Sequence, residues 1–458
     1  MIGCMNQITA KKRTGVFVAI LVTCIVCSML STALNTALPQ IMRDFQVTTA
    51  TGQWLSSIYS LVMGILVLVT PFLIHRCKTK PLYLATLAVF IAGLLLCAFT
   101  SSFSCMMLGR ILQAAGNGVM VSLGQVVLLT VYPKEKRGSI MGIYGLAIGA
   151  APVLAPTLAG LIVDAFGWRM IFYIVLIIST VTWFFTAAFF DNVLETGKES
   201  FDFLSLALCS VGYSGILIGV GNLGTYSLLT TSVLMPLVLG FVAAVLFAYR
   251  QFHIKSPFLE LRILGNVQYR TAVIASMLMY ASMMAASILL PIYVQSVRGY
   301  TATVSGLVTT PGSLAMAFVS PFSGRAYDKM GIRKVFLLGG LLLTLSSLGM
   351  IFINMETALL WIAVLNVIRN VAIGCMMMPF VTWGMSGLEE KYTSHGTALL
   401  TSLRTVAGSF GSAVFVAIVS IVAASTSQAV GMSIAFFGLT IVGAMELVLA
   451  IYVARKKI

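Results

Sequence analysis

Long apolar stretches recur along the whole chain, and short clusters of basic residues separate them. About 20 mostly apolar residues in helical form are enough to cross the hydrocarbon core of a bilayer. Runs of this length lie at 14–37, 52–74, 81–100, 104–131, 138–163, 168–190, 203–222, 230–250, 271–296, 303–324, 334–354, 358–381, 395–424 and 431–453. The pattern predicts an all-α membrane protein with about fourteen transmembrane helices.

The composition agrees with lipid as the main solvent of this chain. Hydrophobic residues make up 59% of the sequence and charged residues only 9%, whereas about a quarter of the residues in a soluble domain are charged. The net charge of +15 comes from basic residues in short loops rather than from one continuous basic face. We therefore expect membrane lipid, and no nucleic acid, as a partner.

Motifs for catalysis, cofactors and metals are missing from the sequence. It contains no nucleophile–base constellation, so we do not expect an enzyme. It also lacks a phosphate-binding G-x-x-x-x-G-K-[ST] loop, which leaves an ion gradient as the source of energy. Cys24 and Cys27 have C-x-x-C spacing but lie in an apolar run without a nearby His, so we predict no metal site and no cofactor.

The basic residues also predict the orientation, because cytoplasmic loops retain Lys and Arg. With the N-terminus inside, the inner segments hold 22 Lys and Arg, and the outer loops hold three. Adding or removing one span would destroy this asymmetry. We predict a multi-pass protein of a bacterial plasma membrane with both termini in the cytoplasm.

Two inner loops occupy equivalent places in the first and second parts of the chain. Residues 71–82 read PFLIHRCKTKPL and residues 324–335 read GRAYDKMGIRKV. Repeated halves with a binding site at their interface are common in secondary transporters. In the second loop we expect an inner gate, with Asp328 and Arg333 as a latch. Its residues are Gly324, Asp328, Gly331 and Arg333.

The span at 138–163 contains GLAIGAAPVLAPTLAG, in which small residues and prolines fall on one helical face. Small residues allow another helix to approach closely, and the prolines remove backbone donors and bend the helix. The set predicts a tight, flexible seam, with ordinary helix packing as the alternative. Its members are Gly145, Gly149, Pro152, Pro156 and Gly160.

Several of these segments resemble motifs of the major facilitator superfamily. GAAPVLAPTLAG (149–160) is similar to the antiporter signature of its exporters, and LGRILQAAGNG (108–118) to its span-four motif. GRAYDKMGIRK (324–334) resembles its loop motif. STALNTALP (31–39) and KRGSIMG (136–142) resemble the fourteen-span drug:proton antiporters of the EmrB/QacA type, and most closely the lincomycin-resistance branch.

This resemblance implies two six-helix halves, at 1–190 and 266–458, with an inserted two-helix hairpin and its linkers at 191–265. It also implies alternating access and multidrug efflux, in which small amphipathic substrates leave the cell in exchange for protons. We expect the chain to work as a monomer.

One departure from the family concerns proton coupling. Related chains carry an acidic residue in span one, but residues 1–43 contain no Asp or Glu. A buried carboxylate is the usual proton carrier, because it can exchange a proton near neutral pH. Glu446 is the only carboxylate well inside a predicted span, Asp164 is a second candidate, and Arg110 resembles the span-four Arg of the family's proton pathway. The alternative for Glu446 is a residue that reaches the inner interface or pairs with a basic group.

Three arginines lie inside predicted spans, where a charge is expensive and needs a partner. They are Arg110, Arg369 and Arg404. Either they bond structurally to carbonyls and to polar residues such as Asn35 and Gln113, or they make a substrate cavity electropositive. The second interpretation favours anionic or zwitterionic cargo.

Flat and flexible apolar side chains suit a cavity that accepts several ligands. Together with the polar residues above, the cavity candidates are Asn35, Trp54, Tyr59, Gln113, Tyr280, Arg369, Met377, Phe380, Trp383 and Arg404. Core or lipid-facing packing is the alternative for each apolar member. At the level of function, the alternatives are a dedicated exporter of an anionic metabolite or lipid-like molecule, without obligatory proton coupling, and a ligand-binding sensor without transport.

Overall fold

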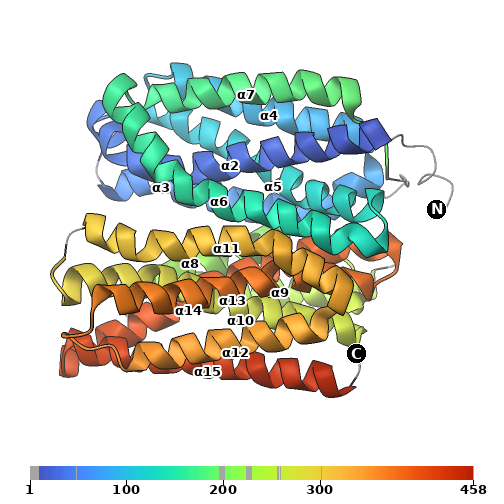
Figure 1. Cartoon of the computed structure of the whole chain (residues 1–458). Helices are drawn as coiled ribbons and strands as arrows, with labels where there is room; N and C mark the ends of the chain where they lie inside the picture. The colour runs from blue at the N-terminus through green and yellow to red at the C-terminus, as the bar shows by residue number, and fades with distance from the viewer. Residues whose placement is uncertain are drawn as a thin grey trace. The chain divides into compact units, whose positions relative to one another are not determined.

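Each predicted apolar run folds as an α-helix in the computed structural model of the chain (Figure 1). The structure describes residues 10–47, 49–194, 197, 202–222, 229–254, 257, 259–300 and 302–456, and this part contains no β-strand. The first seven helices are α2 (Ala10–Asp44), α3 (Thr49–Arg76), α4 (Thr79–Phe99), α5 (Phe103–Val131), α6 (Lys134–Phe166), α7 (Arg169–Phe189) and α8 (Phe203–Asn222). The all-α prediction is confirmed for the described residues.

The remaining helices follow the same pattern of long helix and short connection. They are α9 (Thr231–His253), α10 (Val267–Ile292), α11 (Ala302–Met330), α12 (Ile332–Ile351), α13 (Leu359–Ser386), α14 (Thr393–Ser425) and α15 (Gln428–Lys456). Three single-turn helices lie between them, η1 (Leu261–Gly265), η2 (Tyr293–Val297) and η3 (Glu390–Tyr392).

Twelve of the described helices are long and apolar enough to cross a membrane. Helices α6 and α11, with 33 and 29 residues, also exceed the length of a span but are not among the twelve. Helix α11 contains two prolines and many Ser and Thr residues, which lower its apolar content. A multi-pass membrane protein is therefore supported, while the total of fourteen spans stays a prediction.

Large apolar side chains on the helix surfaces fit a lipid environment. Val181 and Phe184 on α7 and Phe318 on α11 are mostly exposed in the protein alone. Extended apolar surface of this kind is rare on water-soluble monomers. In a bilayer, such surface faces hydrocarbon.

The chain divides into two compact units, and each is described by itself. The first contains residues 1–133, 150–206 and 255–259. Within it, α4 and α3 pack against α5, and α2 and α7 complete the bundle. Glycines allow these helices to pack closely. A Cβ on Gly93 would lie 2.8 Å from the Gln113 backbone nitrogen, and one on Gly118 would lie 2.6 Å from the Met63 carbonyl oxygen.

The second unit contains residues 134–149, 207–254 and 260–458. Helix α10 packs on α14, α11 on α13, and α12 on both α13 and α15. Helices α8 and α9 touch where a Cβ on Gly215 would lie 2.6 Å from the Gly240 Cα. This pairing fits a helical hairpin. The division at 190 and 266 and the inserted nature of the hairpin stay predictions, because grouping by contact does not test sequence repeats.

Candidate functional site

The early part of α6 is held by a carboxylate from α11. Asp328 accepts hydrogen bonds from the Gly138 amide (2.9 Å), the Ser139 amide (2.7 Å) and the Ser139 hydroxyl (2.6 Å). Gly138 and Ser139 belong to the second turn of α6, and the partial positive charge near the start of a helix favours a carboxylate there. Asp328 thus binds the early part of α6 from α11, and its predicted pairing with Arg333 stays a prediction.

Glycine explains how the two helices come so close. A Cβ on Gly138 would lie 2.6 Å from the Gly324 carbonyl oxygen, and one on Gly142 would lie 2.7 Å from the Ser320 carbonyl oxygen. Gly145 continues this row, with Met378 Cγ 2.6 Å from the position of a Cβ. Close helix packing is thus described at Gly138, Gly142 and Gly145, and of these three Gly145 belongs to the predicted seam.

The later members of the predicted seam give less information. The side chains of Pro152 and Pro156 and the surroundings of Gly149 lie outside the described residues. At Gly160 no atom lies within 4 Å of an added Cβ. This glycine makes no close contact in the described structure, so it does not take part in a tight packing seam there.

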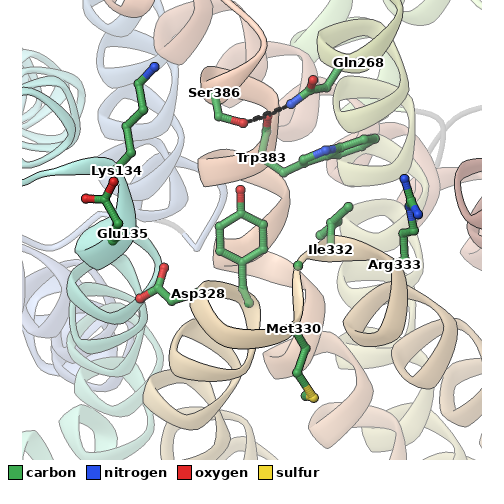
Figure 2. A pocket seen from close by; sticks show the side chains of 11 residues that line it. Lys134, Glu135, Gln268, Asp328, Met330, Ile332, Arg333, Trp383 and Ser386 are labelled. Atoms are coloured by element: carbon green, nitrogen blue, oxygen red, sulfur yellow. Dashed lines mark hydrogen bonds between the residues drawn. The ribbon is translucent and has the colours of Figure 1, made fainter. Parts of the chain in front are cut away.

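A pocket of about 600 Å³ adjoins the latch (Figure 2). Figure 2 shows Lys134 and Glu135 on one side of it, Asp328 below, and Trp383 with Gln268 on the other side. The predicted gate residues Gly331 and Arg333 also line it. Gly331 ends α11 with a positive φ of 73°, a backbone conformation that favours glycine. The basic and acidic residues that line this pocket suit a gate that opens and closes.

Trp383 belongs to this pocket near the predicted inner gate. Its backbone carbonyl accepts a hydrogen bond of 2.6 Å from Gln268 Nε2, which also donates to the Ser386 hydroxyl (2.9 Å). The structure therefore groups Trp383 with the gate residues and not with the buried arginines described below.

A second ionic contact holds the beginning of α6. Arg137 Nη2 lies 3.6 Å from Glu390 Oε1, and the Arg137 side chain is largely buried. Burial lowers the pKa of the Arg137 guanidinium, and the Glu390 carboxylate acts in the opposite direction. Neither residue was singled out from the sequence, because their pairing joins segments about 250 residues apart.

The buried Arg110 has partners on all sides in the first unit. Its Nε donates to the Leu55 carbonyl (3.2 Å), its Nη1 donates to Gln113 Oε1 (2.7 Å), and its guanidinium lies 4.1 Å from the centre of the Tyr59 ring. Asn117 Nδ2 donates to the Tyr59 hydroxyl at 2.7 Å. The structure thus brings together Arg110, Gln113 and Tyr59 as a satisfied polar cluster, which matches the structural interpretation.

Arg369 of α13 bonds to α10 within the second unit. Its Nη2 donates to the Ser282 carbonyl and, at 2.7 Å, to the Ser282 hydroxyl, while its Nε has no partner. The side chain is almost fully buried. Arg369 therefore ties two helices together, with part of its hydrogen-bonding capacity unused.

Arg404 of α14 differs from the other two arginines. It is 7% exposed, and its buried Nε and Nη1 atoms have no hydrogen-bond partner in the described chain. The ring of Tyr280, on α10, lies 5.1 Å from the guanidinium carbon. Arg404 and Tyr280, two of the cavity candidates, are thus neighbours.

Glu446 is fully buried on α15. Neither carboxylate oxygen accepts a well-aligned hydrogen bond from the described residues. The Met279 backbone on α10 is the neighbouring polar group. No described basic group pairs with it, which argues against the interface or ion-pair alternative. A buried carboxylate without a counter-ion is costly, so Glu446 remains the candidate proton carrier.

The other candidates have different environments. Asp164 is exposed near the end of α6, and Trp54 is 49% exposed on α3, so neither lies in a buried cluster of its unit. Phe380 is buried against Phe336, with ring centres 4.7 Å apart, and Met377 is also buried, which agrees with core packing. The side chain of Asn35 lies outside the described residues.

The sequence match now decides the family. Residues 20–412 match the profile of the Major Facilitator Superfamily. The chain belongs to this superfamily. Major facilitator proteins are transporters and not enzymes, so this multi-pass chain is a transporter.

Bacterial relatives extend over most of its length. The chain is 38% identical to the uncharacterized major facilitator transporter YcnB of Bacillus subtilis over 406 residues, which are 89% of this chain and 84% of YcnB. It is 32% identical to the lincomycin resistance protein LmrB of the same organism, over 89% of this chain and 86% of LmrB. A riboflavin transporter of Clostridioides difficile, RibZ, is 25% identical over 88% of each chain.

A solved structure agrees with the fold. The human organic anion transporter MFSD10 superposes with a TM-score of 0.71 over 96% of this chain and 99% of its own, at 14% identity. At this identity the likeness concerns the fold alone, which is that of a major facilitator protein.

Proposed function

We propose that this major facilitator protein exports small amphipathic compounds from a bacterial cell by alternating access, driven by proton entry. Its similarity to LmrB, which is named for lincomycin resistance, supports efflux. The observation that carries the proton-coupled form is Glu446, a buried carboxyl group near the Met279 backbone and without a counter-ion in the described chain.

The proposed topology has fourteen spans, with α6 and α11 added to the twelve apolar helices. Their lengths of 33 and 29 residues support this addition. Helices α8 and α9 form the inserted hairpin between two six-helix halves, both termini lie in the cytoplasm, and the chain acts as a monomer in the plasma membrane. The basic residues of the predicted inner loops support this orientation.

In the proposed cycle, Asp328 holds the inner gate closed by binding the early part of α6. Opening breaks its three hydrogen bonds and the Arg137–Glu390 contact, and the freed carboxylates then bind water. Protonation and deprotonation of Glu446 bias the change, because a carboxylate needs water or a partner and its protonated form does not.

Everted membrane vesicles test the proton coupling. We expect an exported substrate to dissipate a preformed pH gradient in vesicles with the natural chain, and the Glu446→Gln variant to abolish this signal while still binding substrate. Glu356→Gln, which changes an exposed carboxylate, is the control and keeps the signal. An unchanged signal in Glu446→Gln would remove Glu446 from the mechanism.

A dedicated metabolite exporter without proton coupling is the second candidate. It is favoured by Arg110, which donates to Gln113 and a backbone carbonyl, whereas the family resemblance implies an acidic partner from span one. Transport that is equal with and without a pH gradient would select this candidate. Binding without any flux would select a ligand sensor.

A further inference from the structure

The three arginines inside predicted spans are not equivalent. Arg110 donates to a carbonyl and to Gln113, and Arg369 donates twice to Ser282. Arg404 is the exception, since two of its guanidinium nitrogens are buried without a partner in the described chain. Leaving a buried charged donor unpaired costs more free energy than leaving a neutral one unpaired, so such a group is expected to meet a ligand or water.

No described acidic residue pairs with Arg404. Its electrostatic neighbours are Tyr280 and Tyr144, and both are aromatic residues with hydroxyl groups. The carboxylates described in ion pairs of this unit, such as Glu390, engage other residues. The positive charge of Arg404 is therefore not neutralised within its unit.

The surroundings of Arg404 combine an aromatic surface with further unused donors. Gly408, one turn after Arg404, lies so close to Tyr280 that a Cβ there would be 2.6 Å from ring atom Cδ1. This glycine gives the ring space to lie against α14. Thr401, one turn before Arg404, has a buried hydroxyl without a partner, as does Tyr213 on α8, which lies in the neighbourhood of Tyr280.

We infer that Arg404 is the anion-binding group of the substrate site, and that the preferred substrates are monoanions in which a carboxylate is attached to an apolar or aromatic body. One guanidinium in an apolar environment balances one negative charge, whereas a second charge would be left unpaired. The Tyr280 ring provides a flat surface for the substrate body, and the hydroxyls of Thr401 and Tyr213 are further donors for the carboxylate.

This inference rests on the proposed export function for its physiological meaning, but binding tests it separately. The full chain is purified in detergent and titrated with three probes of one shape, namely phenylbutanoate, its methyl ester and phenylbutylamine. We expect the carboxylate to bind at least about ten-fold more tightly than the other two. Equal or tighter binding of the amine would overturn the inference.

Variants connect this preference to Arg404. Arg404→Gln is expected to weaken carboxylate binding about ten- to hundred-fold and to leave the weak ester binding unchanged. It is also expected to raise the melting temperature of the ligand-free protein, because an unpaired buried charge is removed. A lower melting temperature would indicate a structural partner and contradict the inference. Arg270→Gln, which changes an exposed arginine on α10, is the matched control.

Two milder variants keep the test decisive if Arg404→Gln does not fold. Thr401→Val and Tyr213→Phe each remove one unpartnered hydroxyl and are expected to weaken carboxylate binding several-fold. Unchanged affinity in both variants would contradict the site. Tight carboxylate binding without flux in vesicles would refute export and leave the inference intact, whereas flux of amines alone would refute the inference and leave export intact.

Discussion

Gly138 on α6 and Gly324 on α11 show how the lack of side chains allows two helices to pack closely. At Gly324 an added Cβ would overlap the Gly138 carbonyl oxygen, and the backbone cannot move aside as a flexible side chain can. The same closeness lets Asp328 reach the α6 amides, so packing and these hydrogen bonds depend on the same two glycines.

Gly324→Ala is therefore expected to lower stability by about 1–3 kcal/mol through overpacking and to reduce transport. Gly160→Ala is the matched control, since no atom lies within 4 Å of its added Cβ. Alanine is the better helix former, so this control is expected to be neutral or stabilising by up to about 1 kcal/mol. Melting temperatures and vesicle transport measure both variants. A tolerated Gly324→Ala would show that the seam is looser than described.

At the scale of elements, a carboxylate of α11 binds the early part of α6. Asp328 accepts hydrogen bonds from Gly138 and Ser139, in the second turn of α6, across almost 190 positions of the chain. These bonds are lost as soon as the two helices separate, which makes them suitable for a gate.

Asp328→Asn removes the charge and is expected to weaken the contact between α6 and α11 by about 1 kcal/mol. Hydrogen exchange at the amides of Gly138 and Ser139 should then become faster, because these amides lose an acceptor outside their own helix. Lys329→Gln, which changes the exposed neighbour of Asp328, is expected to leave this exchange unchanged. Equal protection in Asp328→Asn and the natural chain would contradict the latch.

At the scale of the whole molecule, the apolar surface requires hydrocarbon as solvent, and the cysteines report on orientation. Cys105, near the start of α5, is exposed, whereas Cys24, Cys97 and Cys375 are buried. Cys77, between α3 and α4, is partly exposed. The proposed topology places Cys105 near the outer surface and Cys77 near the inner one.

A membrane-impermeant maleimide is therefore expected to label Cys105 in intact cells and Cys77 only in everted vesicles. Cys105→Ser and Cys77→Ser identify each signal. Cysteines introduced at Lys136 and Met330, both exposed, should react from the inner side together. Labelling of these two positions from opposite faces would refute the topology and the transporter cycle built on it.

The sequence by itself determined the helices, because membrane-spanning segments are specified by the local length and hydrophobicity of each run. It also determined the family, because motifs such as LGRILQAAGNG and GRAYDKMGIRK are contiguous. The same local information placed Arg110, Arg369 and Arg404 inside helices but did not show which of them has bonding partners.

Only the tertiary structure separated these arginines, because their partners come from other helices. Ser282 meets Arg369 across 87 residues, and Leu55 meets Arg110 across 55, while Arg404 meets an aromatic ring and no counter-ion in the described chain. It likewise showed close helix contacts at Gly138, Gly142 and Gly145 and a buried Glu446 without a counter-ion among the described residues. Whether a buried polar group is satisfied depends on which helices pack against it, and a single helical segment does not contain that information.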